Sequence, residues 1–163
     1  HLHRERAIQF LCICANTIDA DEIRAALDQS GLRIPVVTED RYDAVNAADL
    51  VWTASGTATL ETALLGKPMI VVYRVSWFTY LLARLLVRVE HIGMVNLIAG
   101  ERLMPELIQS EVSADRLAAE SRLMLDDPIA RTRISEKLSQ LRDRLGSPGA
   151  ADRVANIALA MIS

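Results

Sequence analysis

Hydrophobic runs alternate with amphipathic stretches over the first two thirds of the chain. Apolar runs without helical periodicity predict buried strands at 7–14, 33–38, 50–54 and 69–74. Helical patterns follow them at 17–31, 40–49, 55–66 and 76–89. This β-α-β-α order, with near-continuous apolar strands, indicates an α/β fold: a Rossmann-like, mostly parallel sheet with helices on both faces.

The pattern changes in the last third of the chain. From about residue 103 onward we predict no further strand, only three or four amphipathic helices that form a helical C-terminal tail. Breaks between these helices are expected at Asp127-Pro128 and at 146–149, where glycine and proline gather.

Length and composition indicate one globular domain. The chain has 163 residues, of which 51% are hydrophobic and 24% charged. Its net charge of −3, with the signs interspersed, argues against a nucleic-acid partner. The longest apolar stretch contains Arg84 and Arg88 and is shorter than the roughly 20 residues that span a bilayer. With no signal peptide visible, we expect a cytoplasmic protein.

The cysteine and histidine residues do not suggest a metal site. Cys12 and Cys14 are one residue apart, so on a strand they point to opposite faces and are expected to be buried apolar residues. His1, His3 and His91 show no ligand spacing with cysteines or carboxylates. We predict no metal and no cofactor.

The stretch "VWTASGTATLE", residues 51–61, leads from a strand into a helix through small residues. Ligands of parallel sheets bind at such positions, and the free N–H groups of a helix start favour an anion such as a diphosphate. Thr57 and Glu61 share one helix face, where the carboxylate can accept hydrogen bonds from the two hydroxyls of a ribose. Leu60 and Leu64 share another face that can pack on the sheet. The alternative is a simple helix cap, with Glu61 complementing the helix dipole.

Asn96 is an amide within an apolar run, bracketed by Gly93 and Gly100. The two glycines suggest a loop at a strand end, where Asn96 could contact a ligand. The alternative is a buried structural asparagine that bonds neighbouring backbone.

The stretch 76–89 carries aromatic residues and arginines at helical spacing, with Trp77, Arg84 and Arg88 on one stripe. Such a stripe could lie on an anionic membrane surface or contact a phosphate. Alternatively, the helix packs into a neighbouring domain and its arginines extend into solvent.

Taken together, residues 54–109 strongly resemble the C-terminal half of the lipid-A-disaccharide synthases, inverting glycosyltransferases of the GT-B fold. The distinctive feature is the combination of "SGTATLE", "KPMIVVYR" and "NLIAG…PELIQ" at these separations. The resemblance implies a Gram-negative enzyme of lipid A biosynthesis. It would transfer diacylglucosamine from UDP-2,3-diacylglucosamine to 2,3-diacylglucosamine 1-phosphate and release UDP, on the inner face of the inner membrane.

The resemblance also implies a donor site that needs no metal. Ser55, Gly56 and Thr57 would lie at the diphosphate, and Glu61 would hold the ribose. The remaining donor-binding residues implied are Tyr73, Arg74, Asn96 and Arg102. Many members have proline before the asparagine, where this chain has Val95, and Gly-Arg-Glu where it has residues 100–102. Arg102 is therefore the expected guanidinium, displaced by one position.

The resemblance further implies that residues 1–163 form a single, incomplete donor domain. The N-terminal acceptor domain and the first donor-domain strand would lie outside the chain, as would the aspartate general base. No catalytic residue is then expected here, and the chain alone should be inactive. The absent strand would lie between residues 8–14 and 49–53, and its removal would leave two strand edges unpaired.

Two other functions stay open. One is another UDP-sugar enzyme of the GT-B fold, either a cell-wall glycosyltransferase or an epimerase, which shares the glycine-and-glutamate motif. The other is a non-catalytic α/β binding module in which Ser55-Gly56-Thr57 only caps a helix.

Overall fold

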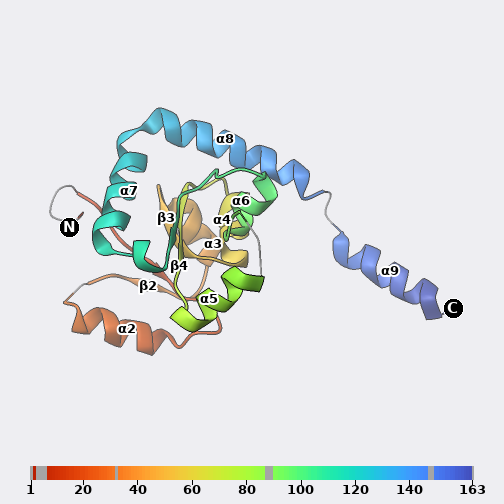
Figure 1. Cartoon of the computed structure of the whole chain (residues 1–163), viewed down its shortest axis with the longest axis horizontal. Coiled ribbons are helices and arrows are strands. Elements are labelled where there is room, and N and C mark those ends of the chain that lie inside the picture. The colour runs from red at the N-terminus through yellow and green to blue at the C-terminus, as the bar shows by residue number, and fades with distance from the viewer. Residues whose placement is uncertain (1, 3–6, 32, 87–89, 147–148, 163) are drawn as a thin grey trace.

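The computed structural model describes residues 2, 7–31, 33–86, 90–146 and 149–162 (Figure 1). Its strands are β1 (Cys12–Ile13), β2 (Val36–Val37), β3 (Val51–Ala54), β4 (Met69–Tyr73) and β5 (Glu106–Ile108). The helices before β5 are α2 (Ala20–Gln29), α3 (Arg41–Ala47), α4 (Thr57–Leu64), α5 (Trp77–Leu86) and α6 (Met94–Ala99). After β5 come η1 (Gln109–Glu111), α7 (Ala114–Asp126), α8 (Pro128–Arg144) and α9 (Ala150–Ile162).

All strand pairs in the described residues are parallel, as predicted, but they form two sheets. β1 pairs with β2, and the second sheet has the order β3-β4-β5. The two sheets meet through side chains, where the Phe10 and Trp52 rings lie 5.8 Å apart between centroids. In the part of the chain that is described, one edge of β1 and one edge of β3 therefore have no ladder partner.

The core lies around β4, whose Met69, Ile70 and Val71 are almost fully buried. α4 packs against β3 and β4, and α6 and α8 pack in turn against α4. α7 packs against β4 and α8, and its Ser121 hydroxyl accepts a hydrogen bond of 2.9 Å from Trp52 Nε1. Helices thus flank the sheet, as expected for a Rossmann-like half of a GT-B fold.

The C-terminal helices begin and end near the predicted breaks. Asp127 caps α8 through the Ala130 N–H, and Pro128 is the first residue of that helix. α9 stands apart from the other elements in Figure 1, and all its described side chains are exposed. None of the described helices has the length and hydropathy to cross a bilayer.

Two predictions about residues 91–109 are wrong. Asn96 lies on helix α6 rather than in a loop, and β5 follows the point where strands were expected to stop. α6 has six residues and β5 three, too few for a hydrophobic period to become visible. β5 also begins with a buried glutamate, which breaks the apolar run that would have indicated a strand.

The strands predicted at 7–14 and 33–38 are shorter than expected. Each has two residues in the ladder, joined by hydrogen bonds from Cys12 N to Pro35 O and from Cys14 N to Val37 O. β1 has only β2 beside it in the described residues, so no second ladder extends it.

α4 begins at Thr57, as predicted, but a different face of it is buried. Leu64 is 41% exposed, and the buried residues are Thr59, Thr62 and Ala63. The two threonine hydroxyls donate to helix carbonyls, Thr59 to Gly56 O at 2.7 Å and Thr62 to Ala58 O at 2.8 Å. These small side chains satisfy their own polar atoms, so α4 can pack closely on the sheet.

Gly56 forms the turn between β3 and α4 with φ +145° and ψ −160°. This conformation is open almost only to glycine. A Cβ built on Gly56 would meet nothing within 4 Å, so the constraint comes from the backbone and not from packing.

The unpaired edges of β1 and β3 lead to a prediction about the 163-residue chain produced alone. We expect it to self-associate, because exposed strand edges pair with other chains. Replacing Leu11, 42% exposed beside β1, with lysine should reduce association, whereas Leu123→Lys on the exposed face of α7 should not. Sedimentation velocity measures the association. A monodisperse monomer with a cooperative thermal transition would contradict the prediction.

The Gly56 turn leads to a second prediction. Gly56→Ala and Gly56→Asn should each lower the free energy of unfolding by about 1–3 kcal/mol, because neither residue tolerates this φ and ψ. Gly31→Asn is the matched control: Gly31 has φ +72°, in the left-handed region that asparagine accepts, and equally open surroundings. Chemical denaturation of the full-length gene product measures the change, and a neutral Gly56→Asn would show that the turn can rearrange.

Candidate functional site

The carboxyl ends of β3, β4 and β5 meet at one edge of the sheet. Ala54 is in register with Val72, and Tyr73 with Ile108. The Ser55 N–H continues the ladder by donating to Val72 O at 3.0 Å. The sheet therefore brings Ser55 beside the end of β4, where the predicted site residues Tyr73 and Arg74 lie half-buried and exposed, respectively.

The first turn of α4 presents free backbone donors at this edge. Gly56 is its N-cap and has no side chain to cap the helix, and no side-chain hydrogen bond replaces it. The first N–H groups of a helix have no partner within the helix. Together with the positive end of the helix dipole, they favour a bound anion.

Thr57 and Glu61 are both exposed on α4, one turn apart, as the spacing predicted. No hydrogen bond or ion pair holds the Glu61 carboxylate among the described residues, so it is free to accept hydrogen bonds from a ligand. The helix thus offers N–H donors, a hydroxyl and an acceptor along one exposed side.

The Ser55 hydroxyl is engaged within the protein. It donates to the carbonyl of Ile92, at 2.9 Å. A serine has one O–H proton, so this hydroxyl cannot donate to a phosphate oxygen at the same time. Ser55 therefore holds the turn, and the donors left for a ligand are the backbone N–H groups of Thr57 and Ala58 and the exposed Thr57 hydroxyl.

Asn96 is fully buried on α6, and its amide is satisfied within the protein. Its Oδ1 accepts from Met104 N, and its Nδ2 donates to Met104 O and to Glu106 Oε1, each at 2.8 Å. In this arrangement Asn96 has no atom left for a ligand and holds α6 to the start of β5.

Glu106 is a residue that sequence reasoning did not single out. Its side chain on β5 accepts hydrogen bonds from the backbone N–H groups of Ile92, at 3.0 Å, and Gly93, at 2.9 Å, besides Asn96. The available signal was a carboxylate inside the apolar "PELIQ", because a buried charge needs partners.

Gln109, directly after β5, also holds a backbone segment through its side chain. Its Oε1 accepts from Val75 N at 2.8 Å and its Nε2 donates to Val75 O at 3.0 Å. Gln109 has φ +52°, an unusual value for a residue with a side chain. This pair of hydrogen bonds anchors the segment directly after Arg74.

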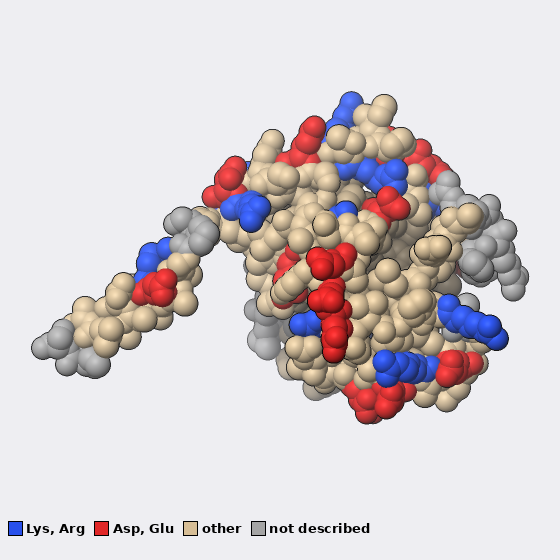
Figure 2. All heavy atoms as spheres, turned by 180° about the vertical axis from the view of Figure 1, so that it is seen from behind, with Lys and Arg blue, Asp and Glu red and all other residues tan. Residues whose placement is uncertain are grey.

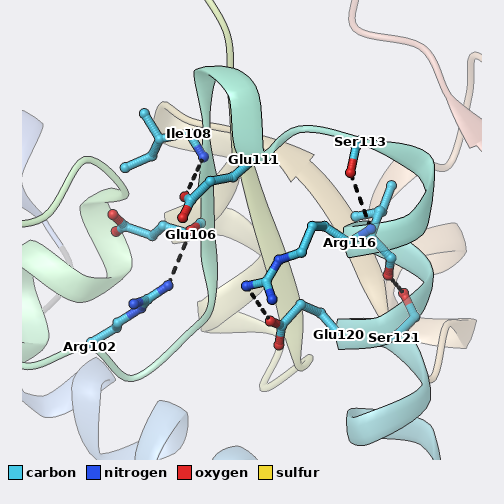
Figure 3. Close-up of polar contacts among 9 residues, drawn as sticks. Arg102, Glu106, Ile108, Glu111, Ser113, Arg116, Glu120 and Ser121 are labelled. Atoms are coloured by element: carbon cyan, nitrogen blue, oxygen red, sulfur yellow. Dashed lines mark hydrogen bonds and ion pairs between the residues drawn. The ribbon is translucent and has the colours of Figure 1, made fainter.

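Arg102 precedes β5 and reaches along its outer edge, where Nη2 donates to Glu106 O at 3.2 Å. Figure 3 shows the guanidinium beside this backbone, while the Glu106 carboxylate points away from Glu111 and Arg116. The guanidinium lies at Glu106, which is in register with Val71, two positions before Tyr73 at the end of β4. The structure brings Ser55, Gly56, Thr57, Tyr73 and Arg74 to one end of the sheet, and no hydrogen bond joins Arg102 to them among the described residues.

Charge is scattered over the face of the molecule that is turned to the viewer in Figure 2. Figure 2 shows Lys and Arg side chains on that face in small groups between acidic and uncharged ones. No cluster of His, Cys, Asp and Glu that could hold a metal occurs among the described residues. Two shallow hollows, of about 350 and 440 Å³, lie elsewhere, beside Arg33 and beside Tyr42. Neither hollow is lined by a predicted site residue, of which Thr57, Glu61 and Arg74 are exposed.

Comparisons with known proteins agree with this architecture. Residues 6–160 match the family model described as lipid-A-disaccharide synthetase. The chain is similar to lipid-A-disaccharide synthases from Syntrophus aciditrophicus, at 50% identity over 95% of this chain, and Geobacter metallireducens, at 43% over 98%. It spans 41% of the length of each of these two curated relatives. With 155 consecutive positions matched by the family model, the chain belongs to the lipid-A-disaccharide synthetase family.

Proposed function

We propose that this chain is the donor-nucleotide-binding half of a lipid-A-disaccharide synthase. The whole enzyme transfers diacylglucosamine from UDP-2,3-diacylglucosamine to 2,3-diacylglucosamine 1-phosphate and releases UDP. The support comes from family membership, together with the parallel α/β architecture that suits a nucleotide.

The observation that carries the proposal is the start of α4. Gly56 leaves room for a diphosphate, and the uncapped N–H groups at the carboxyl end of β3 face outward beside Thr57. Glu61, exposed one turn further, accepts hydrogen bonds from the ribose hydroxyls. A carboxylate next to a diphosphate would repel it. Glu61 lies one helical turn from the proposed diphosphate position, which suits an interaction with the ribose instead.

The proposed chemistry needs charge stabilisation on the departing UDP. This negative charge is stabilised by the backbone N–H groups at the α4 start and by the guanidinium of exposed Arg74 as the bond to the sugar breaks. Tyr73 lies at the same end of the sheet. The general base that takes the acceptor hydroxyl proton lies in the acceptor domain, outside this chain. Residues 1–163 therefore act on their own as a binding unit for UDP.

Two alternatives can be separated by experiment. UDP should slow amide exchange at residues 55–61 in the full-length gene product, and no protection would favour a non-catalytic module. The full-length product should form the disaccharide from UDP-diacylglucosamine and its acylated acceptor. UDP protection without disaccharide would favour another UDP-sugar enzyme, either a cell-wall glycosyltransferase or an epimerase.

The role of Glu61 can be tested by comparing two ligands. Glu61→Ala should weaken UDP binding about tenfold or more, because hydrogen bonds to a charged group contribute about 1.5–3 kcal/mol. Binding of inorganic pyrophosphate, which has no ribose, should change little. The matched control is Glu136→Ala, an exposed acid on α8. Titration calorimetry measures both ligands, and equal losses for the two would refute the ribose role.

The proposal includes contact with the inner face of the inner membrane, where acylated substrates reside. Trp77 and Phe78 at the start of α5 are 70% and 74% exposed, and Leu81 and Leu82 follow them on the same helix, also exposed. Aromatic side chains beside aliphatic ones suit the interface of a bilayer. The side chains of Arg84 and Arg88, which complete the predicted stripe, lie outside the described residues.

This contact predicts a loss of vesicle binding. The double change Trp77→Ser and Phe78→Ser should weaken binding to phosphatidylglycerol vesicles about tenfold or more, because each large apolar side chain contributes about 1.5–3 kcal/mol when buried. Ile129→Ser on α8, 65% exposed, is the matched control and should change nothing. Co-sedimentation measures the bound fraction. Equal behaviour of both variants would exclude α5 as the contact.

A further inference from the structure

We propose that Glu106 is a positioning residue that fixes the Ile92-Gly93 turn and, through it, the Ser55-Gly56-Thr57 turn that binds the diphosphate. This inference rests on the proposed function for its effect on UDP. The contacts that carry it, however, are present without any ligand.

The Glu106 carboxylate is buried and is held by N–H donors. Glu106 is 5% exposed, and no lysine or arginine among the described residues pairs with its side chain. Arg102 donates to the backbone carbonyl of Glu106 and not to its carboxylate. The negative charge is therefore stabilised by three N–H donors: Oε2 accepts from Ile92 N, and Oε1 accepts from Gly93 N and Asn96 Nδ2.

Ile92 links this carboxylate to the diphosphate turn. Ile92 is held at both ends of the residue: its N–H donates to Glu106, and its carbonyl accepts from the Ser55 hydroxyl at 2.9 Å. Ser55 is in turn tied to β4 through Val72 O. The Ser55 backbone is therefore held by β4, and its side chain by the Ile92 carbonyl. Gly56 and Thr57 follow directly, so the Ile92 turn supports the residue that leads into them.

There is no space for a side chain at Gly93. A Cβ built there would lie 3.1 Å from Glu106 Oε1 and 3.3 Å from Val71 Cγ2. Gly93 has φ −75°, which any residue adopts, so its backbone does not require glycine. Glycine is needed because the Glu106 carboxylate packs directly against the turn and leaves no room for a side chain. Such close packing is expected if Glu106 holds the turn in place.

Asn96 holds the Glu106 side chain in its orientation. One side-chain amide holds both Met104, just before β5, and the Glu106 oxygen that accepts from Gly93. Asn96, implied as a donor-binding residue by the family resemblance, thus acts on the site through Glu106 and the turn.

Glu106→Gln tests the proposal, because glutamine keeps the size of the side chain but has one acceptor oxygen in place of two. One of the two backbone N–H groups then faces an NH2 donor. In the full-length gene product without ligand, amide exchange at Ile92 and Gly93 should accelerate about tenfold or more. The Kd of UDP should rise about 5–20-fold, with uridine changed less than twofold. A 5–20-fold rise in the Kd corresponds to about 1–1.8 kcal/mol, the scale of one hydrogen bond.

Glu111→Gln is the matched control. The Glu111 carboxylate also accepts a backbone N–H, from Ile108 at 3.2 Å, but it is exposed and has no link to Ile92. Neither amide exchange at Ile92 and Gly93 nor the UDP Kd should change in this variant. Ser55→Ala should reproduce the UDP loss and add nothing to Glu106→Gln, since both break the same connection. If Glu106→Gln does not fold, Ser55→Ala alone carries the UDP and uridine comparison.

The outcomes separate this inference from the proposed function. Unchanged exchange at Ile92 and Gly93 in folded Glu106→Gln, or additive losses in the double variant, would overturn the positioning role while UDP binding by the native protein stands. Faster exchange in a protein that does not bind UDP would support the positioning of the turn and refute the proposed ligand. A UDP loss matched by an equal uridine loss would overturn the link to the diphosphate.

Discussion

A buried carboxylate that no cation pairs with among the described residues constrains the arrangement of this part of the sheet. Glu106 must be solvated by N–H dipoles, and three of them converge on it from the turn before α6 and from α6 itself. These hydrogen bonds therefore fix β5, α6 and the Ile92 turn relative to one another. β5 is three residues long, yet Glu106 and the residue directly after the strand, Gln109, hold the segments that follow two other elements, α5 and β4.

In the proposed function, an anion binds with few cationic side chains beside it. The donors proposed for it at the α4 start are backbone groups, Gly56 leaves them without a side-chain cap, and Ser55 just before them is held by Ile92. Fixed dipoles of this kind need no reorganisation when charge appears on a ligand. Such dipoles stabilise an anion only if they are held rigidly. We infer that the buried side chains of Asn96 on α6 and Glu106 on β5 provide this rigidity through the Ile92 turn.

Much of the fold followed from hydrophobic patterning. The strands at 51–54 and 69–73, the helix start at Thr57 and the break at Pro128 agree with the sequence pattern, because each is long or bounded by residues with strong local preferences. β5 and α6 were missed because they are short and because Glu106 and Asn96 are polar residues in buried positions. Their hydrogen bonds join residues 8 to 14 positions apart, and no local period reveals such pairs.

The same limit applies to the site. The grouping of Ser55, Gly56 and Thr57 could be predicted because it is a local turn between a strand and a helix. The engagement of the Ser55 hydroxyl by Ile92 could not, since the two residues are 37 positions apart. The burial of Thr59 and Thr62 in place of Leu64 likewise depends on how closely α4 approaches its neighbours, which the sequence pattern does not encode.

The junction between the two sheets has a consequence for how the molecule opens. In the described residues no ladder joins β1 and β2 to the larger sheet, and the Phe10 and Trp52 rings meet between the two sheets. Because it shares no ladder with β3, β4 and β5, we expect the smaller sheet to open locally before they do. Burial raises the pKa of the half-buried Cys12 thiol, and Cys14 adds to the shift, so the reactive thiolate is disfavoured in this environment. A rise in the reaction rate of Cys12 would therefore be the expected sign of such a local opening.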